Sequence, residues 1–541
     1  MIFGKDKNRV QSLEKDLTDL QGIVKSFRKQ TSELKMRGFN MAKIDRLKAD
    51  WLSFAKSYNY DISVGGSAML ARGRELFQND PYARNIVRNF RNGIVGENGF
   101  TLRNKAGEWQ QFGSEWKFVL DTVANSKINE LWYRYGIEKC VSIEGDETTR
   151  SYFGTILNSV FTDGEVFIKK LKGKQYNKYG FTTQLITSEQ VDWKLNKDLP
   201  SGNMIVMGVE VTPYWKKVAY WVRKHNPKTE MQTGYSWSTN YDRIDADKVI
   251  HLFKKETVHQ LRGITQFAPV GVRLKMLYGI EEAALTRVRS VANIPWVFEE
   301  IPNALNGGTL AGVGQSADSS GNQLIELEEG QTFQAPKGYQ VKSMEADFPG
   351  GTFGPFVDGN LHGVSAGVGQ GYASVSGNWN GYNYSVSRAA QQSEREEHKD
   401  NQSWFAEQCV NEIFTALLEM SLASGALSLP AGKFDKFNNP YWFGRRWQYA
   451  NPKDEMESNI LGLQSFQKTF EQILADQGLD LEEQLDQIVT EKKLFDGKGL
   501  TDLYNMLMTK YNVAPAQPVK EEPAGSNNGN GKAKHLMEYN K

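Results

Sequence analysis

The pattern of apolar and polar positions along the chain predicts a long helix and distinguishes it from an unusual stretch that precedes it. Residues 385–422 contain neither Gly nor Pro, and apolar side chains recur at helical spacing over 404–420. At 3.6 residues a turn, this pattern predicts a helix of about ten turns. Residues 369–384 combine Gly, Asn, Ser and aromatic residues and carry no charge. We therefore predict an uncharged aromatic loop that leads directly into a long helix.

Between residues 150 and 255 the pattern changes to short β-favouring runs, several of them separated by turn residues, which is typical of a mostly antiparallel sheet. These runs are 166–170, 182–186, 205–211, 218–222 and 249–253. Helical patterns lie on both sides, at 64–92, where Asn-Asp-Pro interrupts the pattern, and at 269–291. Strand-like runs follow at 294–297, 323–327 and 340–344. The sequence thus predicts the α+β class.

The two ends of the chain differ in character. Residues 1–37 are charged and helical in pattern, with a short apolar stripe that favours a helix docking on a neighbour. The stripe consists of Leu13, Leu17, Leu20, Val24 and Phe27. Helical patterns at 452–476, 479–495 and 500–508 precede a C-terminal stretch without core-forming residues. That stretch is predicted to be disordered.

Charge is distributed unevenly, although the formal net charge is only +1. Residues 1–110 hold 20 Lys and Arg against 12 Asp and Glu, a balance of +8, whereas residues 451–508 hold 5 against 12, a balance of −7. This asymmetry indicates surfaces that face different partners, or simply two ordinary solvated faces. Two cysteines provide neither a disulfide framework nor metal spacing, which favours a reducing, intracellular setting. No apolar run approaches 18 residues, so we expect no membrane partner.

Candidate chemistry is sparse. Gly363-Val364-Ser365-Ala366-Gly367 matches the G-x-S-x-G nucleophile elbow by letters, but the elbow needs an apolar strand immediately before it, and residues 357–362 do not form one. No phosphate-loop pattern is present, and the six His residues lack ligand spacing. His398 lies among charged residues and is expected to be solvated. Asp163-Gly164-Glu165 is interpreted as a turn entering a strand. We therefore predict no catalytic, cofactor or metal site.

The loop and the long helix are poorly suited to gripping nucleic acid. Binding grooves interleave aromatic side chains with basic ones, yet residues 369–384 contain no basic residue. The helix over 385–422 carries three Lys and Arg against seven Asp and Glu. Such surfaces would let a polyanion pass without holding it, as a conduit requires.

Several local patterns, taken in order, resemble the lambda-type family of tailed-phage portal proteins. The first half carries Asp163-Gly164-Glu165, Gly208-Val209-Glu210, Ala219-Tyr220-Trp221, Val249–Phe253, Arg262-Gly263-Ile264 and Glu281-Glu282-Ala283-Ala284. The second half carries Tyr382-Asn383-Tyr384-Ser385, Arg388-Ala389-Ala390, Trp404-Phe405, Asn451-Pro452-Lys453-Asp454-Glu455, Gly462-Leu463, Gly478-Leu479-Asp480 and Thr490-Glu491. The resemblance spans residues 64–500, and the order and spacing of the motifs carry it.

The resemblance implies a portal-type subunit with wing, stem, clip and crown, assembled into a ring of typically twelve copies. It assigns an N-terminal helical arm to 1–37, the wing to 38–264, stem helix 1 to 265–293, the clip to 294–350 and stem segment 2 to 351–368. It further assigns a tunnel loop to 369–384, a long wing helix to 385–424, an aromatic and basic connector to 425–450, the crown to 451–510 and a disordered tail to 511–541. Four glycines, at 359, 363, 367 and 369, make stem segment 2 a poor helix by propensity.

The same resemblance implies a non-enzymatic channel for packaging and ejecting double-stranded DNA, located in the virion at one capsid vertex. The implied partners are further copies of the chain, the terminase large subunit, a head–tail adaptor, and the major capsid protein with its scaffold. The expected channel residues are Tyr372, Asn378, Trp379, Asn380, Tyr382, Asn383 and Tyr384 in the loop, with Arg273, Lys275, Arg287 and Arg289 on the stem helix. The alternatives are a serine hydrolase or capsid maturation protease that uses Ser365, and a non-conducting structural adaptor.

Overall fold

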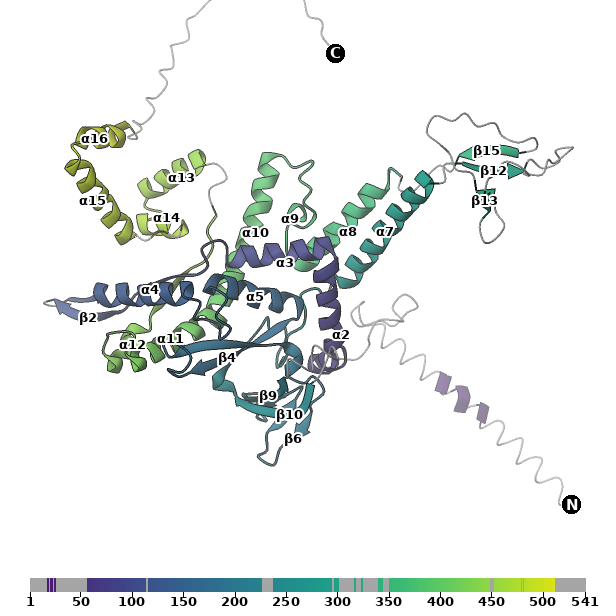
Figure 1. Ribbon diagram of the computed structural model, residues 1–541, viewed down its shortest axis with the longest axis horizontal. Helices are drawn as coiled ribbons and strands as arrows, with labels where there is room; N and C mark the ends of the chain where they lie inside the picture. The colour runs from purple at the N-terminus through teal and green to yellow at the C-terminus, as the bar shows by residue number, and fades with distance from the viewer. Residues whose placement is uncertain are drawn as a thin grey trace, which may run out of the picture. The chain divides into compact units, whose positions relative to one another are not determined.

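The structure is a computed structural model of the 541-residue chain, which divides into two units, residues 1–445 and 446–541 (Figure 1). It describes residues 17–18, 20–22, 24–25, 56–112, 115–225, 237–293, 296–300, 316–317, 323–324, 339–343, 350–447, 452–477, 479 and 481–510. Most of the expected N-terminal arm, most of the expected clip and all of the expected C-terminal tail lie outside the described residues. Predictions for those segments stay predictions.

Two consecutive helices follow the interrupted pattern at 64–92, as predicted. Helix α2 spans Tyr58–Asn79 and α3 spans Pro81–Ile94. Asp80 separates them because its backbone is extended and its carboxylate accepts a hydrogen bond from the backbone N–H of Ala83 at 2.8 Å. Pro occupies the first helical position of α3, where its missing N–H costs nothing. Helices α4 (Thr122–Ile137) and α5 (Thr149–Thr162) follow.

Two antiparallel sheets confirm the prediction for residues 150–255. The three-stranded sheet has the order β11 (Val249–Phe253), β4 (Glu165–Lys172), β5 (Phe181–Ile186). The five-stranded sheet has the order β10 (Trp237–Asp245), β9 (Lys217–His225), β8 (Val209–Val211), β7 (Met204–Val206), β6 (Lys197–Asp198). The chain is therefore a mixture of helices and antiparallel sheet.

One predicted strand is in fact a hairpin. The run 205–211 folds back on itself, and Val206 pairs with Val209 across a two-residue turn. Both turn residues have positive φ, 49° at Met207 and 78° at Gly208, as a tight hairpin turn requires. The sequence pattern missed this turn because Met rarely adopts a left-handed backbone conformation.

The remaining strands form small two-stranded pairs, and short helices complete the first unit. The strand pairs are β1 (Thr101–Asn104) with β16 (Pro440–Phe443), β2 (Gly107–Phe112) with β3 (Glu115–Leu120), β12 (Trp296–Glu300) with β15 (Tyr339–Ser343), and β13 (Ser316–Ala317) with β14 (Gln323–Leu324). The short helices are 3-10 turns at Ser188–Gln190, Ala246–Lys248 and Ala431–Lys433, and α12 at Phe434–Phe437.

A pair of helices carries the chain out of the first unit's core and back (Figure 1). Helix α7 spans Gly271–Asn293 and α8 spans Phe353–Val368. The expectation that glycines would make residues 351–368 a poor helix is wrong, because two of them allow close packing against α7. A Cβ on Gly367 would lie 2.3 Å from Cγ1 of Val270, and one on Gly363 would lie 1.4 Å from the Arg273 guanidinium.

The long helix predicted over 385–422 is present as α10 (Tyr384–Phe405), a π-helical segment (Ala406–Val410) and α11 (Asn411–Ser424). It ends at Gly425, whose φ of 80° is the left-handed conformation common after a helix. The π turn was not predicted, since no Gly or Pro marks it.

The main core lies where α11 packs against the helices and the three-stranded sheet. Phe405 and Phe414 on the long helix are fully buried, and Trp132 of α4, which is 6% exposed, belongs to the same cluster. Trp132 contacts Phe414 edge-on, with ring centroids 6.1 Å apart. A second buried cluster, which includes Trp193, Tyr220 and Leu261, fills the five-stranded sheet region.

In the part of the second unit that the structure describes lie four helices, α13 (Pro452–Gln464), α14 (Phe470–Asp476), α15 (Leu481–Gly497) and α16 (Thr501–Lys510). The helix predicted over 452–476 is therefore divided in two, and Phe466 between the halves has a φ of 58°. Among the described side chains of these helices, many large apolar ones are exposed, including Ile460, Phe470 and Leu494.

Candidate channel loop and the network behind it

The segment after α8 begins at Gly369, whose φ of 68° ends the helix. The prediction of an unbroken loop over 369–384 is wrong in one respect, because Tyr372–Ser376 forms the short helix α9. Small Ala and Ser side chains around a buried Val375 allow this turn to pack closely against neighbouring helices. The segment therefore has a base, residues 369–376, and a tip, residues 377–383.

Tyr372 at the base is packed against α8. Its hydroxyl donates a hydrogen bond of 2.6 Å to Asp358 Oδ1, and its ring stacks on His362 with centroids 4.0 Å apart. Burial, followed by the hydrogen bond to Asp358, raises the pKa of Tyr372. The predicted channel residue Tyr372 thus belongs to the support of the loop.

The tip holds the other predicted loop residues together through local contacts. The side chain of Asn378 accepts a hydrogen bond from the backbone of Asn380 at 3.0 Å. Trp379 is 49% exposed and contacts the ring of Tyr382 edge-on at 5.9 Å. Asn383 caps α10 by accepting from the N–H of Val386 at 2.9 Å.

Tyr384 opens α10, and its side chain lies outside the described residues. The tip therefore presents an exposed indole and amide groups without charge.

The predicted stem residues do not form one patch. Arg273 lies against Gly363, and the ammonium of Lys275 is 2.8 Å from Oε1 of Glu75 on α2. Hydrogen bonding and attraction to Glu75 raise the pKa of Lys275. Arg287 and Arg289 are exposed near the other end of α7. At 1.5 Å per residue, they lie about 20 Å from Arg273 along the helix axis.

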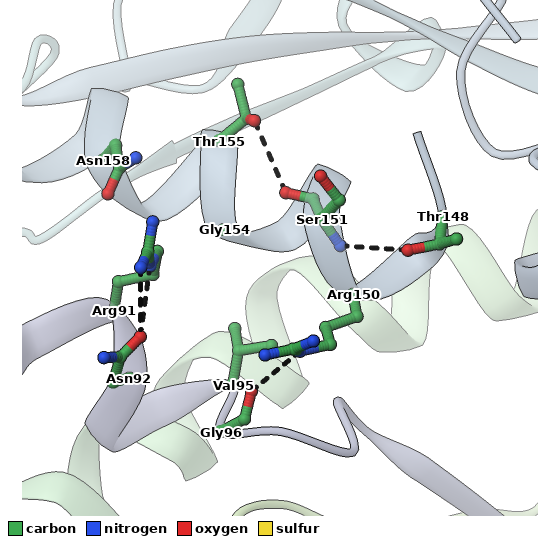
Figure 2. A pocket seen from close by; sticks show the side chains of 10 residues that line it. All are labelled: Arg91, Asn92, Val95, Gly96, Thr148, Arg150, Ser151, Gly154, Thr155 and Asn158. Atoms are coloured by element: carbon green, nitrogen blue, oxygen red, sulfur yellow. Dashed lines mark hydrogen bonds between the residues drawn. The ribbon is translucent and has the colours of Figure 1, made fainter. Parts of the chain in front are cut away.

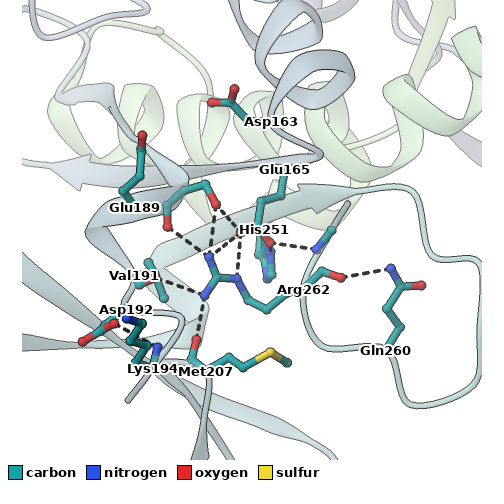
Figure 3. A network of polar contacts seen from close by, with 12 residues as sticks. Asp163, Glu165, Glu189, Val191, Asp192, Lys194, Met207, His251, Gln260 and Arg262 are labelled. Carbon is teal, nitrogen blue, oxygen red and sulfur yellow. Dashed lines mark hydrogen bonds and ion pairs between the residues drawn. The ribbon is translucent and has the colours of Figure 1, made fainter. Parts of the chain in front are cut away.

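A buried ionic network that sequence reasoning missed joins β4 and β11 to Arg262 (Figure 3). Glu165 accepts hydrogen bonds from Nε of Arg262 at 2.7 Å, from Ser188 Oγ at 2.6 Å and from the backbone N–H of Gly263 at 2.9 Å. Its second oxygen also lies 2.9 Å from Nε2 of His251. The side chains of Glu165 and Arg262 have no exposed surface. The only sequence signal was that both belong to the quoted motifs.

Arg262 completes its hydrogen bonding with backbone carbonyls. It donates to the carbonyl oxygens of Val191 at 3.0 Å and Met207 at 2.7 Å, and its guanidinium lies 3.8 Å from the ring centroid of Trp193. The left-handed turn at Met207 thus directs a carbonyl at the cation. Because every donor group is satisfied, the buried charge is tolerated.

The charges in the network set one another's protonation. Burial would raise the pKa of Glu165, but the positive charge of Arg262 and the hydrogen bond from His251 outweigh it and hold that pKa well below its ordinary value. Burial, followed by the nearby Lys217 ammonium, lowers the pKa of His251 to about 3. Burial also lowers the pKa of Lys217 to about 8. His251 is therefore neutral, with its two ring nitrogens between Glu165 and Lys217.

This network fixes the chain at the point where it enters α7. Glu165 opens β4, His251 lies on β11, and Arg262 immediately precedes the segment that leads to α7. Arg74 of α2 adds a second bridge, from its Nε to Asp163 Oδ1 at 2.8 Å and from its NH1 group to Glu189. As predicted, Asp163-Gly164-Glu165 is a turn that enters a strand.

A cavity of about 290 Å³ lies between α3 and α5 (Figure 2). Two arginines lie in its wall, but Arg150 already donates to the carbonyl of Gly96 at 3.0 Å, and Arg91 donates to Asn92 Oδ1 at 3.3 Å. The ten lining residues include no His, Cys or carboxylate. The hydroxyl groups of Thr148, Ser151 and Thr155 therefore have no general base among the lining residues.

The hydrolase alternative does not fit the geometry around Ser365. This residue lies within α8 and is 5% exposed, whereas a nucleophile elbow presents its serine on a sharp turn between a strand and a helix. His362 stacks on Tyr372 of the loop base.

Among the described residues, no group of His, Cys, Asp and Glu could hold a metal ion. In the same part of the chain, no helix is both long and apolar enough to cross a membrane.

His398 corrects another expectation, because it is buried and not solvated. It lies on α10 against α3, where a Cβ on Gly93 would be 2.3 Å from its ring atoms. Burial, followed by the charge of Arg445, lowers the pKa of His398 to about 4. The glycine on α3 makes room for a neutral imidazole between two helices, which a charge-rich sequence context does not reveal.

The fold thus places a supported loop between a helix pair and a long helix. Residues 45–402 match the family described as phage portal protein, lambda family, and the chain belongs to this family. It is 24% identical over 492 residues to the protein named "Probable portal protein" of Halomonas phage phiHAP-1, a match that covers 90% of this chain and 92% of the relative.

Two solved structures are also similar to the chain. For the neck of a native gene transfer agent particle, the TM-score is 0.39 with 9% identity, and the match covers 77% of this chain and 93% of that one. For the virion of the native particle, the TM-score is 0.38 with 10% identity over the same shares. The family assignment rests on the sequence match.

Proposed function

We propose that this phage portal protein assembles into a closed ring, typically of twelve copies, whose central channel conducts double-stranded DNA during packaging and ejection. The observation that carries the proposal is the arrangement of α7, α8, the exposed uncharged tip and α10 within a chain of the portal family. The tip offers aromatic and amide groups, which can lie close to DNA without the tight phosphate contacts that would slow its passage.

Exposed apolar side chains on α7 support the ring. Val272, Met276 and Leu285 are each at least 65% exposed, which is unusual for a helix that leaves the body of a protein. In a ring, each copy would cover these positions on its neighbour, because a cyclic interface uses two faces of every subunit. The chain therefore needs its own copies to complete its packing.

The parts follow from this assembly. Residues 38–264 with the long helix 385–424 form the wing, which contacts the major capsid protein and scaffold at one vertex of the virion. Residues 265–293 and 351–368 form the stem, and 294–350 form the clip. The clip docks the terminase large subunit and later the head–tail adaptor.

The crown over 451–510 faces packaged DNA. Residues 451–508 have a charge balance of −7, which would discourage DNA from adhering there. The protein itself is not an enzyme in this scheme, and the energy for translocation comes from the separate motor.

Native mass spectrometry of the full-length chain, combined with negative-stain imaging, tests the ring. We expect a closed oligomer of about a dozen copies with a central hole. A chain that stays monomeric at every protein concentration and ionic strength would contradict the proposal.

Substitution in the tip then tests the channel. Trp379→Ala should leave the ring mass unchanged and alter DNA translocation or retention, because it removes the exposed indole of the tip. Tyr214→Ala is the matched control, since Tyr214 is 91% exposed and lies outside the loop. Equal effects of the two variants on DNA handling would argue against a channel role for the tip.

A further inference from the structure

The base of the loop is attached to the wing helix α3 by side-chain amides. Helix α9 has only five residues, so its last carbonyl groups have no partner within the helix. Asn85 Nδ2 donates to the carbonyl oxygens of Ser374 at 2.6 Å and Val375 at 3.0 Å. Asn89 Nδ2 donates to the same Ser374 oxygen at 2.7 Å. Asn85 and Asn89 are four residues apart and therefore lie on one face of α3.

Hydrogen bonds donated by residues of the base strengthen this attachment. Gln370, which is buried, donates from Nε2 to the carbonyl oxygen of Ile86 on α3 at 2.9 Å. Ser374 Oγ donates to Glu394 Oε2 on α10 at 2.7 Å. Val375, between these polar groups, is almost completely buried. The base is therefore connected to α3, α8 and α10, and Figure 1 shows α9 beside these helices.

The tip makes a different set of contacts. The hydrogen bonds and ring contacts described for residues 377–383 join them to one another or to residues 372–387. Gly377 and Gly381 border Asn378–Asn380 with φ values of 72° and 79°. A Cβ at either glycine would meet no atom within 4 Å. In the contacts described, the tip is therefore joined to the base and to the start of α10, and not to α3 or α8.

We infer that Asn85 and Asn89 are positioning residues that fix the base of the tunnel loop to α3, so that the base moves with the wing. By holding the base in place, they determine where Trp379 and Tyr382 of the tip are located. The attachment itself follows from the hydrogen bonds, whereas its place in a DNA channel rests on the proposed function. Any displacement of α3 would be transmitted to the base through three donated bonds.

Hydrogen exchange of the full-length chain tests the attachment. The informative amides are those of Val375 and Gly377, which donate to Gly371 and Ala373 within the turn of α9. In the variant Asn85→Ala/Asn89→Ala, loss of three bonds should speed their exchange at least about tenfold. Asn89→Ala alone, which removes one bond, should have the smaller effect. Arg84→Ala is the control, because Arg84 is exposed on the same helix.

The outcomes separate positioning from general stability. We expect unchanged exchange in α5 and α11, an unchanged melting temperature within the error of the control, and faster exchange confined to residues 370–377. Unchanged exchange there in a folded double variant would overturn the inference, as would a uniform increase across the whole chain. If the double variant fails to fold, Asn89→Asp, which keeps the shape but removes the donor, is judged by the same two criteria.

A second measurement keeps this inference distinct from the proposed function. Particles assembled with the double variant should retain packaged DNA differently from particles with Arg84→Ala, although both assemble rings of the same mass. If the wild-type chain forms no ring, the proposed function fails while the exchange result still decides the attachment. If rings form and α9 exchanges faster but DNA retention is unaffected, the attachment stands and its role in the channel is rejected.

Discussion

The guanidinium of Arg262 lies against the carboxylate of Glu165, with Nε 2.7 Å from Oε1, and neither side chain is exposed. Two opposite charges without solvent contact make each residue dependent on the other. They also join the start of β4 to the residues just before α7, so the proposed stem begins at a fixed point.

Removing one partner of this pair should be costly. Arg262→Ala leaves the Glu165 carboxylate buried without its main counter-charge, and we expect the free energy of unfolding to fall by about 3–5 kcal/mol. Urea denaturation followed by tryptophan fluorescence measures the change. Lys275→Ala, which breaks an exposed ion pair with Glu75, is the control and should have no measurable effect. Equal stability of the two variants would show that the network does not stabilise the fold.

The glycines of α8 should differ sharply in their tolerance of alanine. At Gly359 a Cβ meets nothing within 4 Å, so Gly359→Ala should stabilise the helix by about 0.5–1 kcal/mol. At Gly367 the new methyl would collide with the buried Val270, so Gly367→Ala should destabilise by about 1–3 kcal/mol. Thermal unfolding of the matched variants measures the difference. Stabilisation by both would mean that α7 and α8 are not closely packed.

Acid should destabilise the protein through two buried histidines. The folded pKa values of His251 and His398 are lowered to about 3 and about 4, from an ordinary value of 6.5. As the pH falls below 6.5 the unfolded chain binds protons that the folded chain does not, so stability is lost progressively toward those lower values. At pH 5 each histidine should cost about 2 kcal/mol.

Denaturation of the double variant His251→Gln/His398→Gln between pH 7 and pH 5 checks this dependence. We expect a much flatter change in stability with pH than in the wild-type chain, even if the variant is less stable at pH 7. An unchanged slope would mean that other groups determine the response to acid.

Ser365→Ala should leave the protein intact. The hydroxyl is buried in α8, and within the described structure it has no hydrogen-bond partner, so a methyl group can replace it at little cost. We expect a melting temperature equal to or slightly above that of the wild-type chain, and normal assembly. An esterase or protease activity that is present in the wild-type chain and abolished in the variant would restore the hydrolase alternative.

Local pattern was sufficient for much of the fold. The periodicity of 385–422 predicted the long helix, and short β-favouring runs, several of them separated by turn residues, predicted the antiparallel strands. Glycines were harder to interpret. Propensity penalises Gly363 and Gly367 within a helix, but their value appears only when α7 is packed against them.

The contacts that support the site could not be predicted from local sequence pattern either, because they join residues that are far apart in the sequence. Glu165 and Arg262 are 97 residues apart, and Asn85 is 289 residues from Ser374. Nothing in either neighbourhood marks these residues as partners, since an amide or a charge on a helix is usually a solvated group. His398 was misjudged because its polar sequence neighbours project into solvent while its own side chain is covered by α3.

The π-helical segment Ala406–Val410 has a consequence for the orientation of the loop. A π turn accommodates one extra residue, and each residue of an α-helix rotates the chain by about 100°. The segment therefore offsets the angular phase of α10 from that of α11, whose apolar face is fixed in the core. If the same residues were wound as a regular α-helix, Asn383, with the tip before it, would be turned by about 100° around the helix axis, whereas deleting one residue from the segment would remove the π turn and leave that direction nearly unchanged. The π turn thus determines the direction in which the tip is aimed.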